Sequence, residues 1–246
     1  MPDAGVKTVS GIETREVVVQ PLPPPDRLVM DWDHVPVCII TDDGTALSWT
    51  LAENLTARGW KVVVLQGSTS ESKQPSELPQ AVQAIQMHGL GEDQIEAALI
   101  EAAKPYGSPS ALIYLEPAAA GSEPEQSLQA AFWLAKYMQA ALTETIPGGR
   151  NAFMAVARMD GMLGTSGEGD WSATSGGLFG LVKTINLEWE GVFCRAVDVQ
   201  ADLSAEQAAA RILAELEDPE RTIVEVGVGP QERVTLTLAN AARSTS

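Results

Sequence analysis

The residues best equipped for chemistry lie in one stretch, Val156 to Trp189, where carboxylates, hydroxyls and a guanidinium follow one another through a Gly- and Ser-rich segment. Glu168 and Asp170 are two residues apart and could act as a general acid and a general base. They lie in a polar loop, where solvated surface charges explain them more simply. A serine nucleophile would need a histidine base, and neither His34 nor His88 lies near an activated Gly-x-Ser-x-Gly motif.

A strand, a loop and a helix must position this stretch. An apolar run from Ala152 to Ala157 predicts the strand, and Gly- and Ser-rich turn residues follow it. The helix is predicted from apolar residues at helical spacing; these are Leu178, Leu181, Val182, Ile185 and Trp189. Arg158 stands at the end of the strand, where its guanidinium could bind the carboxylate or phosphate of a ligand.

A second candidate site lies nearer the N-terminus. Val37 to Leu65 has the pattern strand, turn, helix, strand, and such βαβ units carry the glycine-rich fingerprint of dinucleotide-binding proteins. Here Gly44 is the one glycine of the turn. Asp42 and Asp43 would set like charge against the phosphates, at a cost on the order of 1 kcal/mol or more each. After the second strand, Gln66 offers neither an acid for a ribose hydroxyl nor an Arg for a 2′-phosphate. These residues favour a βαβ unit kept as a scaffold.

Strand and helix patterns alternate along most of the chain, which predicts a Rossmann-like α/β fold with a doubly wound, mostly parallel sheet. Two alternating segments around Gly229-Pro230 predict a terminal β-hairpin, Thr222 to Val228 and Arg233 to Leu238. We expect one domain over residues 13–238, between a flexible tail at 1–12 and a frayed tail at 239–246. Further strands are predicted at Arg15–Leu22, Val35–Thr41, Ala111–Leu115, Phe153–Ala157 and Phe193–Val199.

Three helices and one ambiguous segment complete the prediction. Ala81 to Met87 fits a short strand or the start of a helix, Gly91 to Ala103 fits a helix, and a Ser204/Gln207 capping pattern opens another. A long helix is expected from a capping box at Ser122 and Glu125 to about Thr145. Its predicted buried stripe is Leu128, Ala131, Phe132, Ala135, Met138 and Leu142.

Composition excludes several classes of function. The net charge of −17 argues against binding to nucleic acid or to an anionic membrane surface. No run is long and apolar enough for a transmembrane helix, and the N-terminus lacks the pattern of a signal peptide, so a cytoplasmic location is expected. Cys38 and Cys194 lie in apolar strand-like runs and are expected to be reduced core residues. No metal site is expected, because the two histidines lack ligands at suitable spacing.

Several segments together resemble the structural subdomain of ketoreductases in multidomain polyketide synthases, especially the type in polyunsaturated fatty acid synthases. They are GGLFGLVKTINLEW from Gly176 to Trp189, the following FCRAVDV, and TIVEVGVGPQERVTLTL from Thr222 to Leu238. Glu190 departs from the family, in which a proline is common at that position. The resemblance extends over roughly residues 13–238.

The wider family, the short-chain dehydrogenases, has a catalytic Ser followed by Tyr-x-x-x-Lys or Asn. In the alignment that the resemblance implies, these three positions are taken by Arg158, Trp171 and Ser175. None can do the original chemistry; an indole, for example, cannot donate a proton as a phenol does. The family's Thr-Gly-x-x-x-Gly-x-Gly turn becomes Thr41, then Asp42, Ala46 and Ser48 at the three glycine positions. Elsewhere, no tyrosine is followed four residues on by lysine.

The resemblance therefore implies a subdomain that has no catalytic residues of its own and binds no cofactor. Such a subdomain braces a second one, in the same chain or as a separate chain, that binds NADPH and reduces a 3-oxoacyl group, with acyl carrier protein as a further candidate partner. Two alternatives stay open. One is an active NADPH-dependent short-chain reductase with a divergent cofactor turn, and the other is a ligand-binding pseudo-enzyme that uses Arg158.

Overall fold

A single mixed sheet organises the chain, and its strands run in the order β1-β9-β8-β7-β6-β5-β2-β3-β4. The computed structural model describes residues 15–29, 34–67, 75, 77–118, 124–144, 149–167 and 172–239. Within them the strands are β1 (Val17–Pro21), β2 (Val37–Thr41), β3 (Lys61–Gln66), β4 (Val82–Gln86), β5 (Ala111–Leu115), β6 (Ala152–Met159), β7 (Phe193–Gln200), β8 (Glu225–Val228) and β9 (Arg233–Leu238).

The parallel part of the sheet begins at β2, and from this strand the chain winds in both directions. From β2 it proceeds outward through β3 to β4, then crosses back to β5 on the other side of β2 and continues to β6, β7 and β8, all in parallel. Every residue of β2 and β5 is buried, as expected of central strands that are covered on both faces. The predicted doubly wound α/β fold is confirmed. The reversal between β2 and β5 is the place where such folds build their sites.

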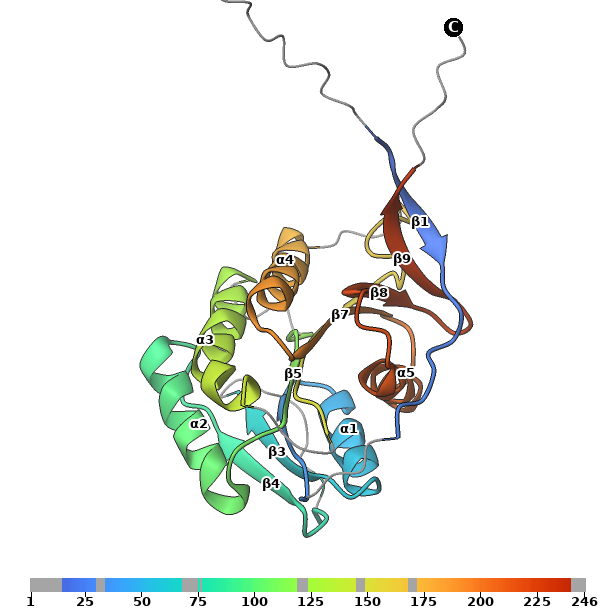
Figure 1. Ribbon diagram of the computed structural model, residues 1–246. Helices are drawn as coiled ribbons and strands as arrows, with labels where there is room; N and C mark the ends of the chain where they lie inside the picture. Colours follow the sequence, from blue (N-terminus) through green and yellow to red (C-terminus); the bar gives the residue numbers. More distant parts are fainter. Residues whose placement is uncertain are drawn as a thin grey trace, which may run out of the picture.

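Helices cover both faces of the sheet (Figure 1). One face is covered by α1 (Leu47–Thr56) and α5 (Ala205–Glu217), and the other by α2 (Glu92–Tyr106), α3 (Pro124–Leu142) and α4 (Ala173–Glu188). Two large apolar clusters of buried side chains lie between the sheet and these two layers. The ambiguous segment near residue 84 is the strand β4, and the capping box at Ser204 opens α5 as predicted.

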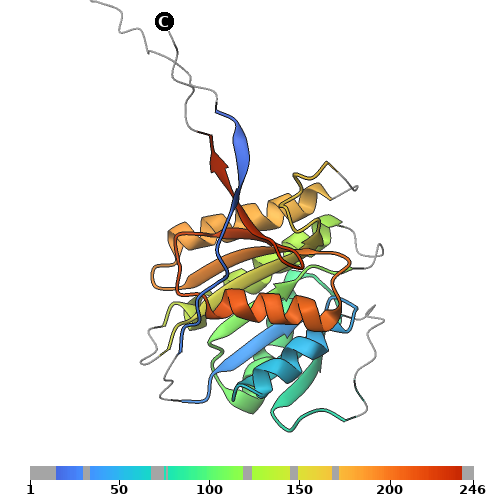
Figure 2. The same cartoon turned by 90° about the vertical axis from the view of Figure 1, so that its right-hand side faces the viewer.

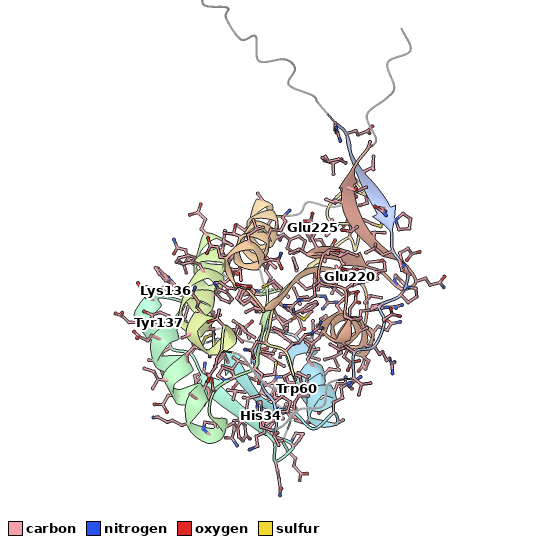
Figure 3. All side chains as sticks on the ribbon, in the orientation of Figure 1. His34, Trp60, Lys136, Tyr137, Glu220 and Glu225 are labelled. Atoms are coloured by element: carbon pink, nitrogen blue, oxygen red, sulfur yellow. The ribbon has the colours of Figure 1, made fainter. Side chains whose placement is uncertain are left out.

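Helix α3 differs from its prediction in two details. It ends at Leu142 rather than near Thr145, and Phe132 is 48% exposed, so its place in the buried stripe was wrong. Because α3 packs between α2 and α4, its buried arc is turned to include Ala130 and Leu134. On the α2 side Glu92 accepts hydrogen bonds from Lys136 Nζ at 2.5 Å and Tyr137 Oη at 3.0 Å, side chains that point outward in Figure 3. Ser122 of the predicted capping box lies outside the described residues, and Glu125 lies in the first turn of the helix.

The two ends of the described chain meet in an antiparallel ribbon. The predicted hairpin is present as β8 and β9, and β1 pairs with the outer side of β9 from Val17↔Leu238 to Pro21↔Val234. A hydrogen bond from Ala239 N to Glu16 O extends the pairing to its tip. Figure 2 shows the ribbon of β1 and β9 rising out of the body of the domain.

Candidate functional site

The turn between β2 and α1 is closed on itself by its own carboxylates. Asp42 Oδ1 accepts hydrogen bonds from the backbone N–H of Gly44 at 3.1 Å and from the hydroxyl of Ser48 at 2.8 Å. Asp43 accepts from the backbone N–H of Thr45 at 3.1 Å and from its hydroxyl at 2.8 Å. The side chains that were expected to face incoming phosphates therefore bind the donors of the turn instead.

This pairing extends to the start of the helix. Ala46 precedes α1 without a side-chain cap, and the Thr45 hydroxyl accepts from Leu47 N at 3.1 Å. Free N–H groups at a helix N-terminus are what make such a turn bind anions. In this turn three of those donors, on Gly44, Thr45 and Leu47, already have acceptors from the chain itself.

The same turn is joined to the strand on the other side of the reversal. Thr41 Oγ1 donates to Leu115 O at 3.2 Å and accepts from Leu115 N at 2.8 Å, while Ala118 N donates to Asp43 O at 2.9 Å. Burial raises the pKa of Asp43, although its Thr45 donors act in the opposite direction. The carboxyl ends of β2 and β5 are thus held together across the point where a cofactor would enter.

Ser175, which the resemblance aligns with the family's Lys or Asn, binds a residue at the end of β5. It is buried in the first turn of α4 and donates from its hydroxyl to Glu116 Oε2 at 2.8 Å. Glu116 follows β5 directly, and burial raises its pKa. The sequence analysis missed Glu116, although an acid placed directly after a fully apolar strand marks the carboxyl edge of a sheet. Together the two residues join α4 to the sheet.

Arg158 also binds the chain itself. Its Nη2 donates to the carbonyl oxygens of Ala201 at 2.6 Å and Leu203 at 2.8 Å, which fastens the turn after β7 to the end of β6. The guanidinium is therefore partly engaged before any ligand arrives. Trp171, Glu168 and Asp170 lie outside the described residues.

The other sequence predictions concern the core and metals. Cys38 and Cys194 are buried free thiols, as predicted, and burial raises the pKa of both. Among the described residues no group of three or more His, Cys, Asp or Glu side chains is placed to hold a metal ion. No helix in this part of the chain is long and apolar enough to cross a membrane.

Comparison with known proteins places this geometry in context. No family model matches the chain. Over 219 residues it is 35% identical to one of the subunits of a polyunsaturated fatty acid synthase from Thraustochytrium sp., in an alignment that covers 86% of this chain and 8% of that protein. The chain is a homologue of that short segment of the synthase.

Solved structures identify the fold. A short-chain dehydrogenase/reductase family oxidoreductase from Aeromonas hydrophila superposes with a TM-score of 0.63 at 18% identity, covering 79% of this chain and 99% of the other. The chain has the short-chain dehydrogenase fold. A short-chain dehydrogenase from Streptomyces avermitilis gives the same TM-score at 16% identity, with 80% of this chain and 89% of the other covered.

In this short-chain dehydrogenase fold, the loop after β6 is held by two carboxyl groups. Asp198 in β7 accepts from Met159 N at 3.0 Å and Leu163 N at 2.7 Å. Asp160 accepts from Met162 N and Gly164 N, each at 2.8 Å, and from Ser166 N at 3.0 Å. Leu163 adopts a φ of 62°, which is unfavourable for a residue other than glycine. The carboxyl groups thus stabilise a strained loop.

Asp160 and Asp198 share a hydrogen bond, and their pKa values are shifted in opposite directions. Burial, followed by the Asp160 contact, raises the pKa of Asp198 to about 7. Partial burial acts to raise the pKa of Asp160. The hydrogen bonds that Asp160 accepts, from Ser166 N first and then from Asp198, outweigh burial and hold this pKa well below its usual range. Below about pH 7 we therefore expect the pair to hold one proton, on Asp198.

This proton makes the stability of the domain pH-dependent. Folding raises the pKa of Asp198. The stability that this group contributes is therefore complete below its pKa in the unfolded chain, about 4, and is lost as the pH rises through about 7. From this group we expect the free energy of unfolding to fall by about 1 kcal/mol per pH unit between pH 5 and 7. Urea unfolding across this range measures the slope.

Asp198→Asn should flatten that slope, since an amide donates to Asp160 at every pH as the protonated carboxyl does. Asp202→Asn, an exposed site three residues beyond Val199, is the matched control and should keep the slope. Equal slopes for the wild type and Asp198→Asn would contradict the assignment of the proton.

Proposed function

We propose that this domain is the non-catalytic structural subdomain of a ketoreductase in a multidomain polyketide or polyunsaturated fatty acid synthase. In this role it braces a second subdomain, which binds NADPH and reduces the 3-oxoacyl group on a carrier protein. The identity to a segment of a synthase polypeptide supports the setting, and the short-chain dehydrogenase fold supports the reductase ancestry.

The observation that carries the proposal is the closed turn after β2. A pyrophosphate needs free N–H donors and a positive local potential. Here Gly44 and Thr45 donate to Asp42 and Asp43, so a phosphate would have to displace two carboxylates and then lie beside them. The repulsion and the lost hydrogen bonds act together against cofactor binding.

The positions of the catalytic residues support the same conclusion. Arg158 holds the turn after β7, and Ser175 holds Glu116, so both side chains serve the fold where the family has a reacting group. The Ser175 hydroxyl already donates to Glu116, and an arginine side chain keeps its protons in proteins, so neither is suited to give a proton to a ketone oxygen. What the domain keeps is the rigid sheet and its helices, which is what a brace requires.

Two measurements test the proposal together. The isolated chain is titrated with NADPH while nicotinamide fluorescence is followed, with a glycine-complete ketoreductase as positive control. We expect no saturable binding up to millimolar cofactor. In the intact synthase polypeptide, deletion of this domain should abolish ketoreduction of a 3-oxoacyl substrate, because the catalytic subdomain loses its support.

The alternative, an active reductase with a divergent turn, is motivated by the intact βαβ frame. Saturable micromolar NADPH binding with ketone reduction by the isolated chain would establish it in place of the brace. Unchanged ketoreduction after deletion of the domain would also overturn the proposal.

A further inference from the structure

The ribbon of β1 and β9 has one apolar face. Directly opposed residues of an antiparallel pair project to the same side of the sheet. The register therefore puts Val17 with Leu238, Val19 with Leu236, and Pro21 with Val234 on one face. The opposite face carries Val18 with Thr237 and Gln20 with Thr235. One side of the ribbon is thus hydrocarbon along its whole length.

The body of the domain covers only the inner end of this apolar face, and the outer end is exposed. Val234 is 4% exposed where the ribbon leaves the body, but Val17 and Leu238 at its outer end are 57% and 58% exposed. The ladder between β8 and β9 ends at Gly227↔Val234, so beyond this point β9 pairs with β1 alone among the described strands. Two-stranded ribbons are marginally stable in water without a packed face.

The free edge of β1 is a second feature that is consistent with a covering partner. Leu22 N donates to Arg233 O and Ala239 N to Glu16 O, which fixes the even-numbered residues of β1 as the ones bonded to β9. The backbone groups of Val17 and Val19 therefore point away from β9, and β1 is an edge strand of the sheet. Val17 to Pro21 carries no charged side chain, although the chain has a net charge of −17. Strand edges that are left to solvent are usually guarded by charges.

The occupant follows from where the described chain ends. Glu16 and Ala239 are hydrogen-bonded neighbours at the tip of the ribbon, so both ends of the described chain lie beside this face. In the synthase relative the matched segment is 8% of the polypeptide, and most of that protein therefore flanks it. A domain joined to either end would therefore be tethered close to the apolar face.

We propose that the outer end of this face, formed by Val17, Val19, Leu236 and Leu238, is the docking surface for the neighbouring domain of the same polypeptide. The neighbour contributes an apolar surface that covers these four side chains, and it lies beside the free edge of β1. The inference rests on the proposed function, in which the neighbour is the catalytic subdomain, and it specifies where the brace makes contact.

Backbone hydrogen exchange tests this proposal in the intact synthase polypeptide and in the isolated chain. We expect the amides of Val17 and Val19 to exchange at least about tenfold more slowly in the intact protein. Leu238→Glu should abolish that difference and lower ketoreduction. Thr237→Glu is the matched control, at the same height on the opposite face, and should keep both. In the isolated chain both variants should melt within about 2 °C of the wild type, since both sites are exposed.

Four results would overturn the inference. Equal exchange rates of these amides in the two proteins would show that nothing covers the face. Equal losses of ketoreduction in Leu238→Glu and Thr237→Glu would show that the apolar face has no special role. If the isolated chain formed a dimer that Leu238→Glu dissociates, the face would be the contact with a second copy of this chain. These results differ from failure of the proposed function, in which deletion of the whole domain leaves ketoreduction unchanged. A deletion that abolishes ketoreduction while Leu238→Glu does not would reject the docking surface alone.

Discussion

Glu215→Leu is expected to destabilise the isolated domain by about 3–5 kcal/mol, because it leaves buried positive charge without its partner. Glu215 in α5 accepts from Arg195 Nη1 at 2.7 Å, from Arg233 Nε at 2.7 Å and from Arg233 Nη2 at 2.9 Å. The Arg195 side chain is fully buried and that of Glu215 is 1% exposed. After the substitution Asp218 is the remaining acid of this buried network, which it shares with both arginines.

The loss should extend to the segment that leads into β2. Arg233 Nη1 donates to Pro23 O at 3.0 Å, and Leu22 N donates to Arg233 O at 2.7 Å, so the network also holds the chain where it leaves β1. Urea unfolding gives the free energy. Hydrogen exchange in residues 22–29 should rise in the variant beyond what global destabilisation explains.

A control lies one half-turn away on the same helix. Glu217 pairs with Arg58 at 3.0 Å on the surface, and Glu217→Leu should cost about 1 kcal/mol or less. Equal losses for Glu215→Leu and Glu217→Leu would show that burial of the first pair has no energetic consequence. The quadruple variant Arg195→Met, Glu215→Leu, Asp218→Asn, Arg233→Leu should recover much of the loss, since it removes every charge of the buried network, and apolar replacement of such a network can be nearly neutral.

The sheet was predictable because its strands carry a strong local signal. Apart from Thr41, the segments VCIIT and ALIYL are apolar at every position, as strands that a parallel sheet buries on both faces must be. The charged residues of FCRAVDV were a further signal that the sequence analysis did not use. Arg195 and Asp198 in a buried strand require partners, and these are supplied by α5, the residues directly after it and the loop after β6, which no local pattern brings together.

The degeneracy of the cofactor turn was predictable, but its closed form was not. The missing glycines are visible in the sequence, whereas the rotamers of Asp42 and Asp43 are not. A carboxylate two residues before a free N–H can bind that N–H or face solvent, and local sequence allows both. The structure selects the first because Asp42 and Asp43 are buried, where a carboxylate without hydrogen-bond donors is costly. The ribbon needed long-range pairing, since β1 and β9 lie at opposite ends of the sequence.

Gly227→Ala should cost about 2–4 kcal/mol and displace the loop after β6, because a methyl group at this position has no room. A Cβ on Gly227 would lie 2.3 Å from the carbonyl oxygen of Gly161 and 2.8 Å from its carbonyl carbon. Backbone atoms cannot rotate aside as a side chain does, so the loop must move away from β8. That movement should weaken the hydrogen bond from Leu163 N to Asp198 Oδ2, which spans 2.7 Å.

Two readouts separate this steric effect from a general loss of stability. Urea unfolding measures the cost, and the pH dependence between pH 5 and 7 reports whether Asp198 still holds its raised pKa. Gly59→Ala is the control, because Gly59 has a φ of 86° and nothing within 4 Å of an added Cβ. It should cost about 1–2 kcal/mol from backbone strain alone and leave the pH dependence intact. If the free energy of unfolding of Gly227→Ala had the wild-type dependence on pH, the contact between β8 and Gly161 would not be required for the position of the loop beside Asp198.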